Sequence, residues 1–341
     1  MQKYNKTPYM IKEIHEQPSV FTRAIHSISE NSELISQLKN AQSIVVIACG
    51  SSANSSQYFA YLMELICRIP TRVVLASEYK YYPTPNSDFV IAVSQSGETT
   101  DTISALKIAK KKRVKTICLT NVLDSSLTQI TDSVLYTHAG PEMSIPATKS
   151  FTAQIAAFIQ IVNIISGNKL SSAIAEIQHH LPIVLSTDVS AAVDICKNAS
   201  NIMYISRGIG YPIVIEGALK MKETTYIHAE GYTAGEIKHG TFSLLSGDTP
   251  VIAICLSGIT YSEMLQDLKE VKSLAPLIII GEINDRSIED IADIFIPIPK
   301  VSEVAGTILS LIIMQLLAYH VAVSLGRDVD NPRNLMKIVN T

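Results

Sequence analysis

The chain has 341 residues, which is room for two domains of ordinary size, and 47% of the residues are hydrophobic, which is enough for two cores. A formal charge of −3, from 28 Lys and Arg against 31 Asp and Glu, argues against a strongly basic surface for nucleic acid or an anionic membrane. Five scattered cysteines without a Cys-x-x-Cys pair suit a reducing compartment and offer no zinc framework. We therefore expect a cytoplasmic protein with a small-molecule partner and without a metal or other cofactor.

The first half of the chain alternates apolar strands with helices. Residues 1–40 form an N-terminal helical segment by their spacing, and the first six residues lack the apolar core of an export signal. Buried strands are predicted at 43–48, 72–76, 90–93, 115–120 and 133–136, with helices at 56–67, 100–112 and 126–131. This order is typical of a parallel, doubly wound α/β sheet, which we assign to residues 41–170.

The strand at 90–93 leads into a polar turn and then the N-terminus of a helix. Such a helix end binds anions, because its first N–H groups are unpaired and the helix dipole is positive there. The hydroxyls of Ser94, Ser96 and Thr99 would add donors for phosphate oxygens, and Gly97 would let the backbone approach a ligand. An ordinary turn with Ser and Thr as helix caps is the alternative, which the pattern alone leaves open.

The same order of elements returns in residues 185–325, at a constant offset of 161 residues. Helices near residues 150–198 join the two copies. The second copy has Cys255, Leu256 and Ile259 where the first has Ser94, Gln95 and Glu98, so we expect one phosphate pocket per chain. The apolar run 304–325 is long enough to span a bilayer, but its polar residues favour a buried helix, and residues 326–341 form a C-terminal tail.

A second group of polar residues lies in the second copy. Glu216, Lys220 and Glu223 follow one face of a predicted helix that starts near Pro212, and the loop after it brings His239 between glycines. A carboxylate near an ammonium, with a histidine in reach, can move protons at neutral pH. The alternative is a salt-bridged stripe on a solvated helix face, which is common at this spacing.

Several longer motifs occur in a fixed order: Cys49-Gly50-Ser51-Ser52, Ser94-Gln95-Ser96-Gly97-Glu98-Thr99, Glu216-Gly217-Ala218-Leu219-Lys220-Met221-Lys222-Glu223, Gly235-Glu236-Ile237-Lys238-His239-Gly240 and the tail from Asp328 to Lys337. With them the chain resembles the isomerase part of glutamine–fructose-6-phosphate aminotransferase (glucosamine-6-phosphate synthase), a member of the tandem SIS-domain family. The resemblance implies two SIS domains, each a doubly wound parallel sheet flanked by helices.

The resemblance also implies roles for the matching residues. The phosphate of the sugar would be held by the hydroxyl and amide side chains of two loops: Ser51, Ser52, Ser94, Gln95, Ser96 and Thr99. Glu223 would move a proton between C1 and C2, His239 of a neighbouring subunit would open the ring, and Lys337 would form an imine with the open-chain ketose.

Other matches line the site or depart from the family pattern. Lys220 matches a lysine lining the site, and Glu216 matches a nearby carboxylate. The turn that begins at Ile145 matches a substrate-binding turn, but Ala147 stands where the family usually has a sugar-contacting serine. Met336, beside Lys337, also stands where the synthase usually has a small residue.

The resemblance implies three functions in order. The first is a glucosamine-6-phosphate deaminase or isomerase that yields fructose 6-phosphate and ammonia. The second is an aminating subunit that takes ammonia directly or from a separate glutaminase subunit, since Gln2 stands where the synthase has its nucleophilic cysteine and we expect no glutaminase domain. The third is a sugar-phosphate-binding regulator, which would have no use for Glu223, His239 and Lys337 together. For the enzymes we expect a homodimer, because His239 would act in the neighbour.

Overall fold

A computed structural model describes residues 7–82 and 87–338 of the chain. They divide into two compact units. The N-terminal unit holds the described residues of 16–142, 149–172 and 336–338, and the C-terminal unit holds 7–15, 143–148 and 173–335. Each unit is built around one five-stranded sheet in which every strand pairs in parallel with its neighbours.

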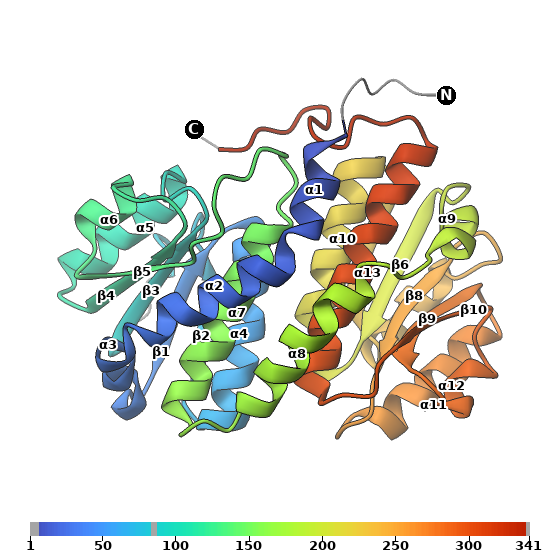
Figure 1. Cartoon of the computed structure of the whole chain (residues 1–341), viewed down its shortest axis with the longest axis horizontal. Helices are drawn as coiled ribbons and strands as arrows, with labels where there is room; N and C mark the ends of the chain where they lie inside the picture. Colours follow the sequence, from blue (N-terminus) through green and yellow to red (C-terminus); the bar gives the residue numbers. More distant parts are fainter. Residues whose placement is uncertain (1–6, 83–86, 339–341) are drawn as a thin grey trace. The chain divides into compact units, whose positions relative to one another are not determined.

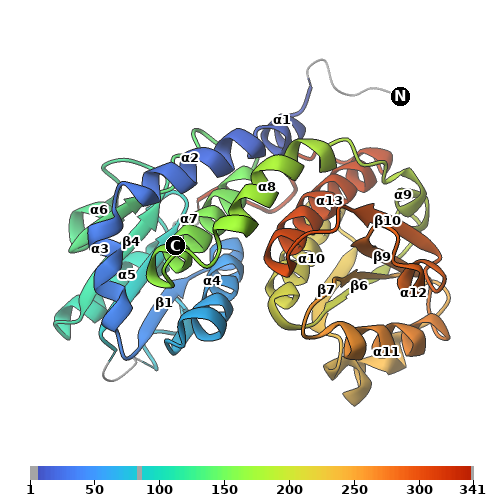
Figure 2. The same ribbon diagram turned by 60° about the horizontal axis from the view of Figure 1, so that its bottom comes forward.

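The sheet of the N-terminal unit has the strand order β2-β1-β3-β4-β5. Strands β1 and β3 are buried at every position, as expected for strands covered on both faces. Helix α4 lies on one face of the sheet and α5 and α6 lie on the other, and α7 packs on α4 (Figures 1 and 2). The elements are α2 (Gln17–Ser29), α3 (Ser32–Ser36), η1 (Gln37–Asn40), β1 (Ile44–Ala48), α4 (Gly50–Leu62), η2 (Met63–Cys67), β2 (Thr71–Leu75), β3 (Phe89–Ser94), α5 (Thr100–Lys111), β4 (Lys115–Thr120), α6 (Ser126–Ile130), β5 (Ser133–Tyr136) and α7 (Lys149–Ile165).

The C-terminal unit repeats this architecture with the order β10-β9-β8-β6-β7. Helix α11 begins and ends 161 residues after α5, which confirms the internal repeat. Helices α10 and α13 pack together on one face of this sheet (Figure 1). The elements outside the N-terminal sheet are α1 (Tyr9–His15), α8 (Ser171–Val184), α9 (Ser190–Cys196), β6 (Asn201–Ser206), η3 (Gly208–Gly210), α10 (Tyr211–Thr225), β7 (His228–Thr233), η4 (Glu236–His239), η5 (Thr241–Leu244), β8 (Val251–Cys255), α11 (Tyr261–Lys272), β9 (Leu277–Glu282), α12 (Arg286–Glu289), β10 (Ile294–Ile298) and α13 (Glu303–Ser324).

Helix α13 is the apolar run that is long enough to cross a membrane. Its most apolar 18-residue window is 89% buried inside the fold. Its side chains therefore pack against the protein around most of the helix, as the polar residues in the run predict.

Two local predictions are wrong. The first helix of the N-terminal sheet begins at Gly50, not near residue 56, so the residues predicted as a turn form the first turn of α4. Strand β7 was not predicted, because its sequence, His-Ala-Glu-Gly-Tyr-Thr, has little apolar character. β7 is an edge strand, and a side chain at Gly231 would come within 2.7 Å of the Ile215 backbone, so this glycine allows α10 to pack closely on it.

Candidate functional site

The two predicted phosphate loops lie at neighbouring strand ends in the N-terminal unit. β1 leads directly into the first turn of α4, which carries Ser51 and Ser52, and β3 leads through the 94–99 loop into α5. β1 and β3 are adjacent strands whose connections run to opposite sides, so their carboxyl ends form the topological switch point of the sheet. In parallel α/β sheets ligands bind at such a point, and here two helix N-termini meet there.

The hydroxyls of the 94–99 loop are partly engaged in shaping it. Ser94 Oγ lies 3.0 Å from Thr99 Oγ1 and accepts the Gly97 N–H at 3.1 Å. Ser96 Oγ accepts a hydrogen bond from the Glu98 N–H at 3.1 Å, and this bond does not use the O–H proton of Ser96. A hydroxyl that accepts from the backbone remains a donor for a bound anion. The loop chemistry is therefore compatible with both capping and phosphate binding.

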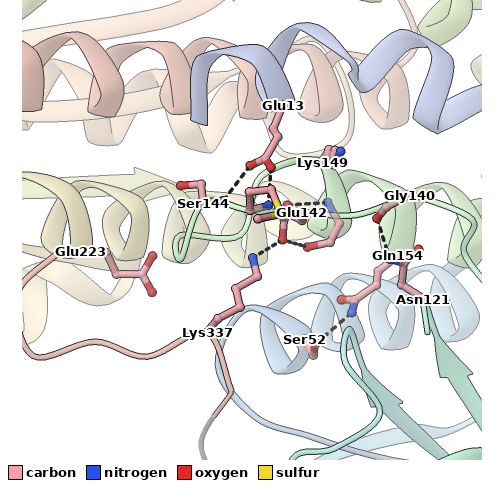
Figure 3. A network of polar contacts seen from close by, with 12 residues as sticks. Glu13, Ser52, Asn121, Gly140, Glu142, Ser144, Lys149, Gln154, Glu223 and Lys337 are labelled. Carbon is pink, nitrogen blue, oxygen red and sulfur yellow. Dashed lines mark hydrogen bonds and ion pairs between the residues drawn. The ribbon is translucent and has the colours of Figure 1, made fainter. Parts of the chain in front are cut away.

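Neighbouring residues hold this loop and the α4 end in place. Gly97 has φ +70°, and a Cβ there would lie 2.0 Å from Ser125 Oγ, so glycine is required. Glu98 accepts from the N–H and the hydroxyl of Ser126, and these hydrogen bonds lower the pKa of Glu98. Ser52 Oγ accepts from the buried Gln154 amide at 2.9 Å, a contact between α4 and α7 (Figure 3).

The C-terminal unit contains a buried row of charges on α10. Lys220 and Glu216 have fully buried side chains, and the side chain of Glu223 is 21% exposed. Lys220 Nζ lies 3.3 Å from Glu216 Oε1 and 2.5 Å from Glu223 Oε2. Burial alone lowers the pKa of Lys220, but the two carboxylates outweigh it and hold that pKa above its ordinary value.

This burial excludes a solvated stripe of surface ion pairs as the interpretation of the row. A stripe of surface ion pairs would be solvated and would contribute little, whereas removing ions from water costs several kcal/mol each. A buried lysine between two carboxylates, one of them partly exposed, occurs both at sites that move protons and in structural ion-pair networks, so the catalytic role of this row stays a prediction.

His239 lies at the end of the short turn η4 and is exposed. Among the described residues, no hydrogen bond or ion pair links His239 to Lys220 or Glu223. The turn that carries it is anchored by the buried Asp267, which binds Lys238 at 2.9 Å and Arg207 at 2.6 Å. The imidazole is thus exposed on an anchored turn, and its action in a neighbouring subunit stays a prediction.

Ile145 and Lys337 belong to different units. The Ile145 N–H donates to the Asp330 carbonyl at 2.9 Å, and Glu13 accepts from the N–H groups of Met143 and Ser144 in the same C-terminal unit (Figure 3). Lys337 belongs to the N-terminal unit, where its Nζ lies 2.5 Å from Glu142 Oε2.

A model of the SIS domain family matches residues 37–164 and 195–325. The chain belongs to the SIS domain family. Each matched segment contains one of the two parallel sheets, so the chain has two SIS copies, as the resemblance implies.

Curated relatives extend beyond this chain. The glutamine–fructose-6-phosphate aminotransferase [isomerizing] of Methanothermobacter thermautotrophicus is 38% identical over 337 residues, which are 97% of this chain and 57% of the relative. The protein of the same name from Gloeobacter violaceus is 38% identical over 358 residues, 97% of this chain and 58% of the relative. The chain spans little more than half the length of these curated relatives.

Solved structures give the same picture. The C-terminal domain of glucosamine-fructose-6-phosphate aminotransferase from Francisella tularensis is similar with a TM-score of 0.84 and 31% identity, covering 97% of this chain and 100% of that one. Glucosamine-6-phosphate deaminase from Thermotoga maritima has a TM-score of 0.76 at 23% identity, covering 93% and 99% of the two chains, which is a likeness of fold alone.

At the switch point of its sheet, the second SIS copy has the carboxylate of Glu303 where the first copy has a loop of hydroxyl side chains. A cavity of about 10 Å³ lies there, lined by Arg207, Thr260 and Glu303 among others, and it is too small for a phosphate. A Cβ on Gly258 would lie 2.6 Å from Glu303 Oε2, so the carboxylate fills the space beside this loop, and burial raises the pKa of Glu303. A larger cavity of about 670 Å³ lies beside the same loop and is lined by Ser257, Gly258, Arg286 and Lys300 among others, so one phosphate pocket per chain stays a prediction.

Within each unit, the structure adds contacts of the candidate residues that sequence reasoning missed. Glu142 pairs with Lys337, Gln154 binds Ser52, and Asp267 anchors the His239 turn. Glu142 lies in the segment that follows the carboxyl end of β5. Ligands of open α/β sheets bind beyond the carboxyl ends of strands, so this position could have marked Glu142 as a candidate site residue. Gln154 and Asp267 lie inside helices and carry no such signal.

Proposed function

We propose that this chain is the sugar-phosphate isomerase part of an aminotransferase that makes glucosamine 6-phosphate from fructose 6-phosphate and ammonia. The observation that carries the proposal is the buried Glu216–Lys220–Glu223 row, because a sugar-binding module without chemistry has no need of it. The sequence favours the deaminating direction, whereas relatives at 38% identity are named aminotransferases, and we follow the relatives.

The proposed reaction assigns a step to each group. The loops of the first SIS copy hold the phosphate, and His239 of a neighbouring subunit protonates the ring oxygen as the ring opens. Lys337 forms an imine at C2 with loss of water, and ammonia then replaces the lysine nitrogen on C2. Glu223 removes a proton from C1 and returns it to C2 while the C1 hydroxyl becomes the aldehyde, which gives glucosamine 6-phosphate.

The direction is tested with the full chain and two substrate pairs. Fructose 6-phosphate with ammonium should give glucosamine 6-phosphate, and glucosamine 6-phosphate alone should release ammonia more slowly at matched saturation. Ammonia release as the faster reaction would restore the deaminase as the better description. Adding glutamine in place of ammonium shows whether the assayed chain obtains ammonia from it.

Ser96→Ala and Thr99→Ala should each raise KM for fructose 6-phosphate by about 10-fold or more, with kcat changed little, since a hydrogen bond to a charged group is worth about 1.5–3 kcal/mol. Each hydroxyl holds the phosphate equally in the ground and transition states, so removing a hydroxyl weakens substrate binding and leaves the chemical step unchanged. Thr128→Ala on α6 is the matched control, because its hydroxyl donates to the Ser125 carbonyl outside the loop. Equal binding of fructose with and without its phosphate would contradict this assignment of the loop.

We also propose that His239 acts in the neighbouring subunit of a dimer, which its exposure on an anchored turn supports. Mixing inactive His239→Ala with inactive Glu223→Gln protein, under conditions of subunit exchange, should then restore part of the activity. The control mixes Glu223→Gln with a Glu223→Gln, His239→Ala double variant. Neither protein in this mixture has Glu223, so no activity should be restored. No recovery despite proven exchange would place His239 in its own chain's site.

A further inference from the structure

Glu142 is a buried carboxylate that faces the amine of Lys337 in the N-terminal unit. Its side chain is fully buried, and its Oε2 lies 2.5 Å from Lys337 Nζ (Figure 3). The first turn of α7 holds the same carboxylate, because Ser150 donates its N–H at 3.0 Å and its hydroxyl at 2.7 Å. The carboxylate is therefore fixed from the helix side, and the tail lysine is brought to it.

A terminal lysine on a solvated tail has no need of such a partner. Burial alone raises the pKa of Glu142, but Lys337 and the hydrogen bonds from Ser150 outweigh it and hold that pKa below its usual value. Lys337 keeps 25% of its side chain exposed, so it lies at the edge of the buried region and not inside it. The pair thus combines a fixed, buried carboxylate with a lysine side chain that is partly exposed.

The other charged residues beside this pair in the N-terminal unit bind each other. Lys149, next to Ser150 on α7, has its Nζ 2.6 Å from Glu16 Oε2 on the α2 side. The ammonium of Lys149 is thus matched by Glu16, and the charge that acts on Glu142 comes from Lys337.

We propose that Glu142 is the positioning residue of Lys337, which orients the amine and accepts its proton when the imine forms. This inference rests on the proposed imine role of Lys337. An ammonium cannot attack a carbonyl, so one proton passes from Nζ to the Glu142 carboxylate, and the neutral amine then forms the N–C2 bond. The proton returns as the C2 hydroxyl leaves as water, and the iminium cation stays paired with the carboxylate. Overall, one ammonium and one carbonyl give one iminium and one water.

The test measures single-turnover imine formation on the full chain. Fructose 6-phosphate is added with cyanoborohydride, and the reduced adduct on the Lys337 peptide is quantified by mass spectrometry between about pH 6.5 and 9. In the wild type the proton is transferred internally, so the rate should depend little on pH. In Glu142→Gln the proton must go to solvent, so the rate should be at least about 10-fold lower near pH 7 and should rise with pH.

Two further variants separate this role from a structural one. Glu142→Asp keeps a carboxylate and should restore a flat pH profile with part of the rate. Ser150→Ala removes one donor to the carboxylate without touching Lys337 and should also stay flat. Glu16→Gln, which breaks the adjacent Lys149 pair, is the matched control and should resemble the wild type.

Each remaining result overturns the inference. A wild-type rate in Glu142→Gln at every pH would show that the carboxylate is not needed. An equal loss at every pH, with Glu142→Asp no better, would show a purely structural role. No adduct on the wild type, or an undiminished adduct on Lys337→Ala, would instead remove the imine role itself, and these two results are visible without any Glu142 variant.

Discussion

Glu223→Gln is expected to lower kcat by roughly 100- to 10,000-fold, the range typical of a lost general base, with KM for fructose 6-phosphate nearly unchanged. Glutamine keeps the size of glutamate and its ability to accept a hydrogen bond from Lys220, whose Nζ lies 2.5 Å from Glu223 Oε2. The change removes the basic carboxylate and keeps the shape of the site, so the rate of proton transfer should fall while sugar binding stays the same. Steady-state kinetics at saturating ammonium measure it.

The matched control is Glu263→Gln on α11, an exposed carboxylate of the same unit, which should leave kcat unchanged. Circular dichroism and thermal unfolding should show that Glu223→Gln folds, since its side chain is partly exposed and Lys220 keeps Glu216 as a partner. A variant with kcat within a factor of about 3 of the wild type would exclude Glu223 as the base, because such a loss is far below the general-base range.

Lys337→Ala should eliminate the reduced fructose 6-phosphate adduct and lower isomerisation about as much as Glu223→Gln does. The imine at C2 acidifies the C1 protons, so without it the carboxylate faces a much weaker acid. Peptide mass spectrometry after cyanoborohydride treatment measures the adduct. Ring opening should persist in this variant, because it depends on His239 and not on the lysine.

Lys111→Ala, at the exposed end of α5, is the control for loss of a surface lysine and should trap the adduct normally. The imine role would be refuted by a full-strength adduct on Lys337→Ala, or by full activity after residues 335–341 are removed. An adduct at another lysine of the wild type would move the role to that residue.

Most strands could be predicted from sequence, because buried parallel strands are short apolar runs bounded by polar turns. Lys115–Thr120 and Ser133–Tyr136 have the predicted bounds, and the repeat offset placed α11. β7 and the start of α4 were missed because their polar residues hide the pattern. In α4 the serines occupy the helix N-terminus, where exposed N–H groups make polar residues favourable.

Sequence motifs and the resemblance named the candidate residues one by one, but they could not predict the environment of those residues. Spacing placed Glu216, Lys220 and Glu223 on one helix face, yet burial depends on α13 packing against α10 from about 90 residues further along the chain. The contact of Glu142 with Lys337 joins residues 195 positions apart, which no local pattern reveals. Periodicity reports which residues share a face, and the partner of that face comes from tertiary packing.

The central claim is that this chain moves a proton between C1 and C2 of a hexose 6-phosphate, and it can be tested without any nitrogen source. The full chain is incubated with fructose 6-phosphate in D₂O and followed by proton NMR, with Glu223→Gln in parallel. The account predicts that the wild type loses the C1 proton signal of fructose 6-phosphate, as the enolamine takes up deuterium at C1 and the imine is then hydrolysed, and that the variant keeps this signal. Unlabelled sugar after prolonged incubation with folded wild-type protein, or equal labelling by both proteins, would contradict it.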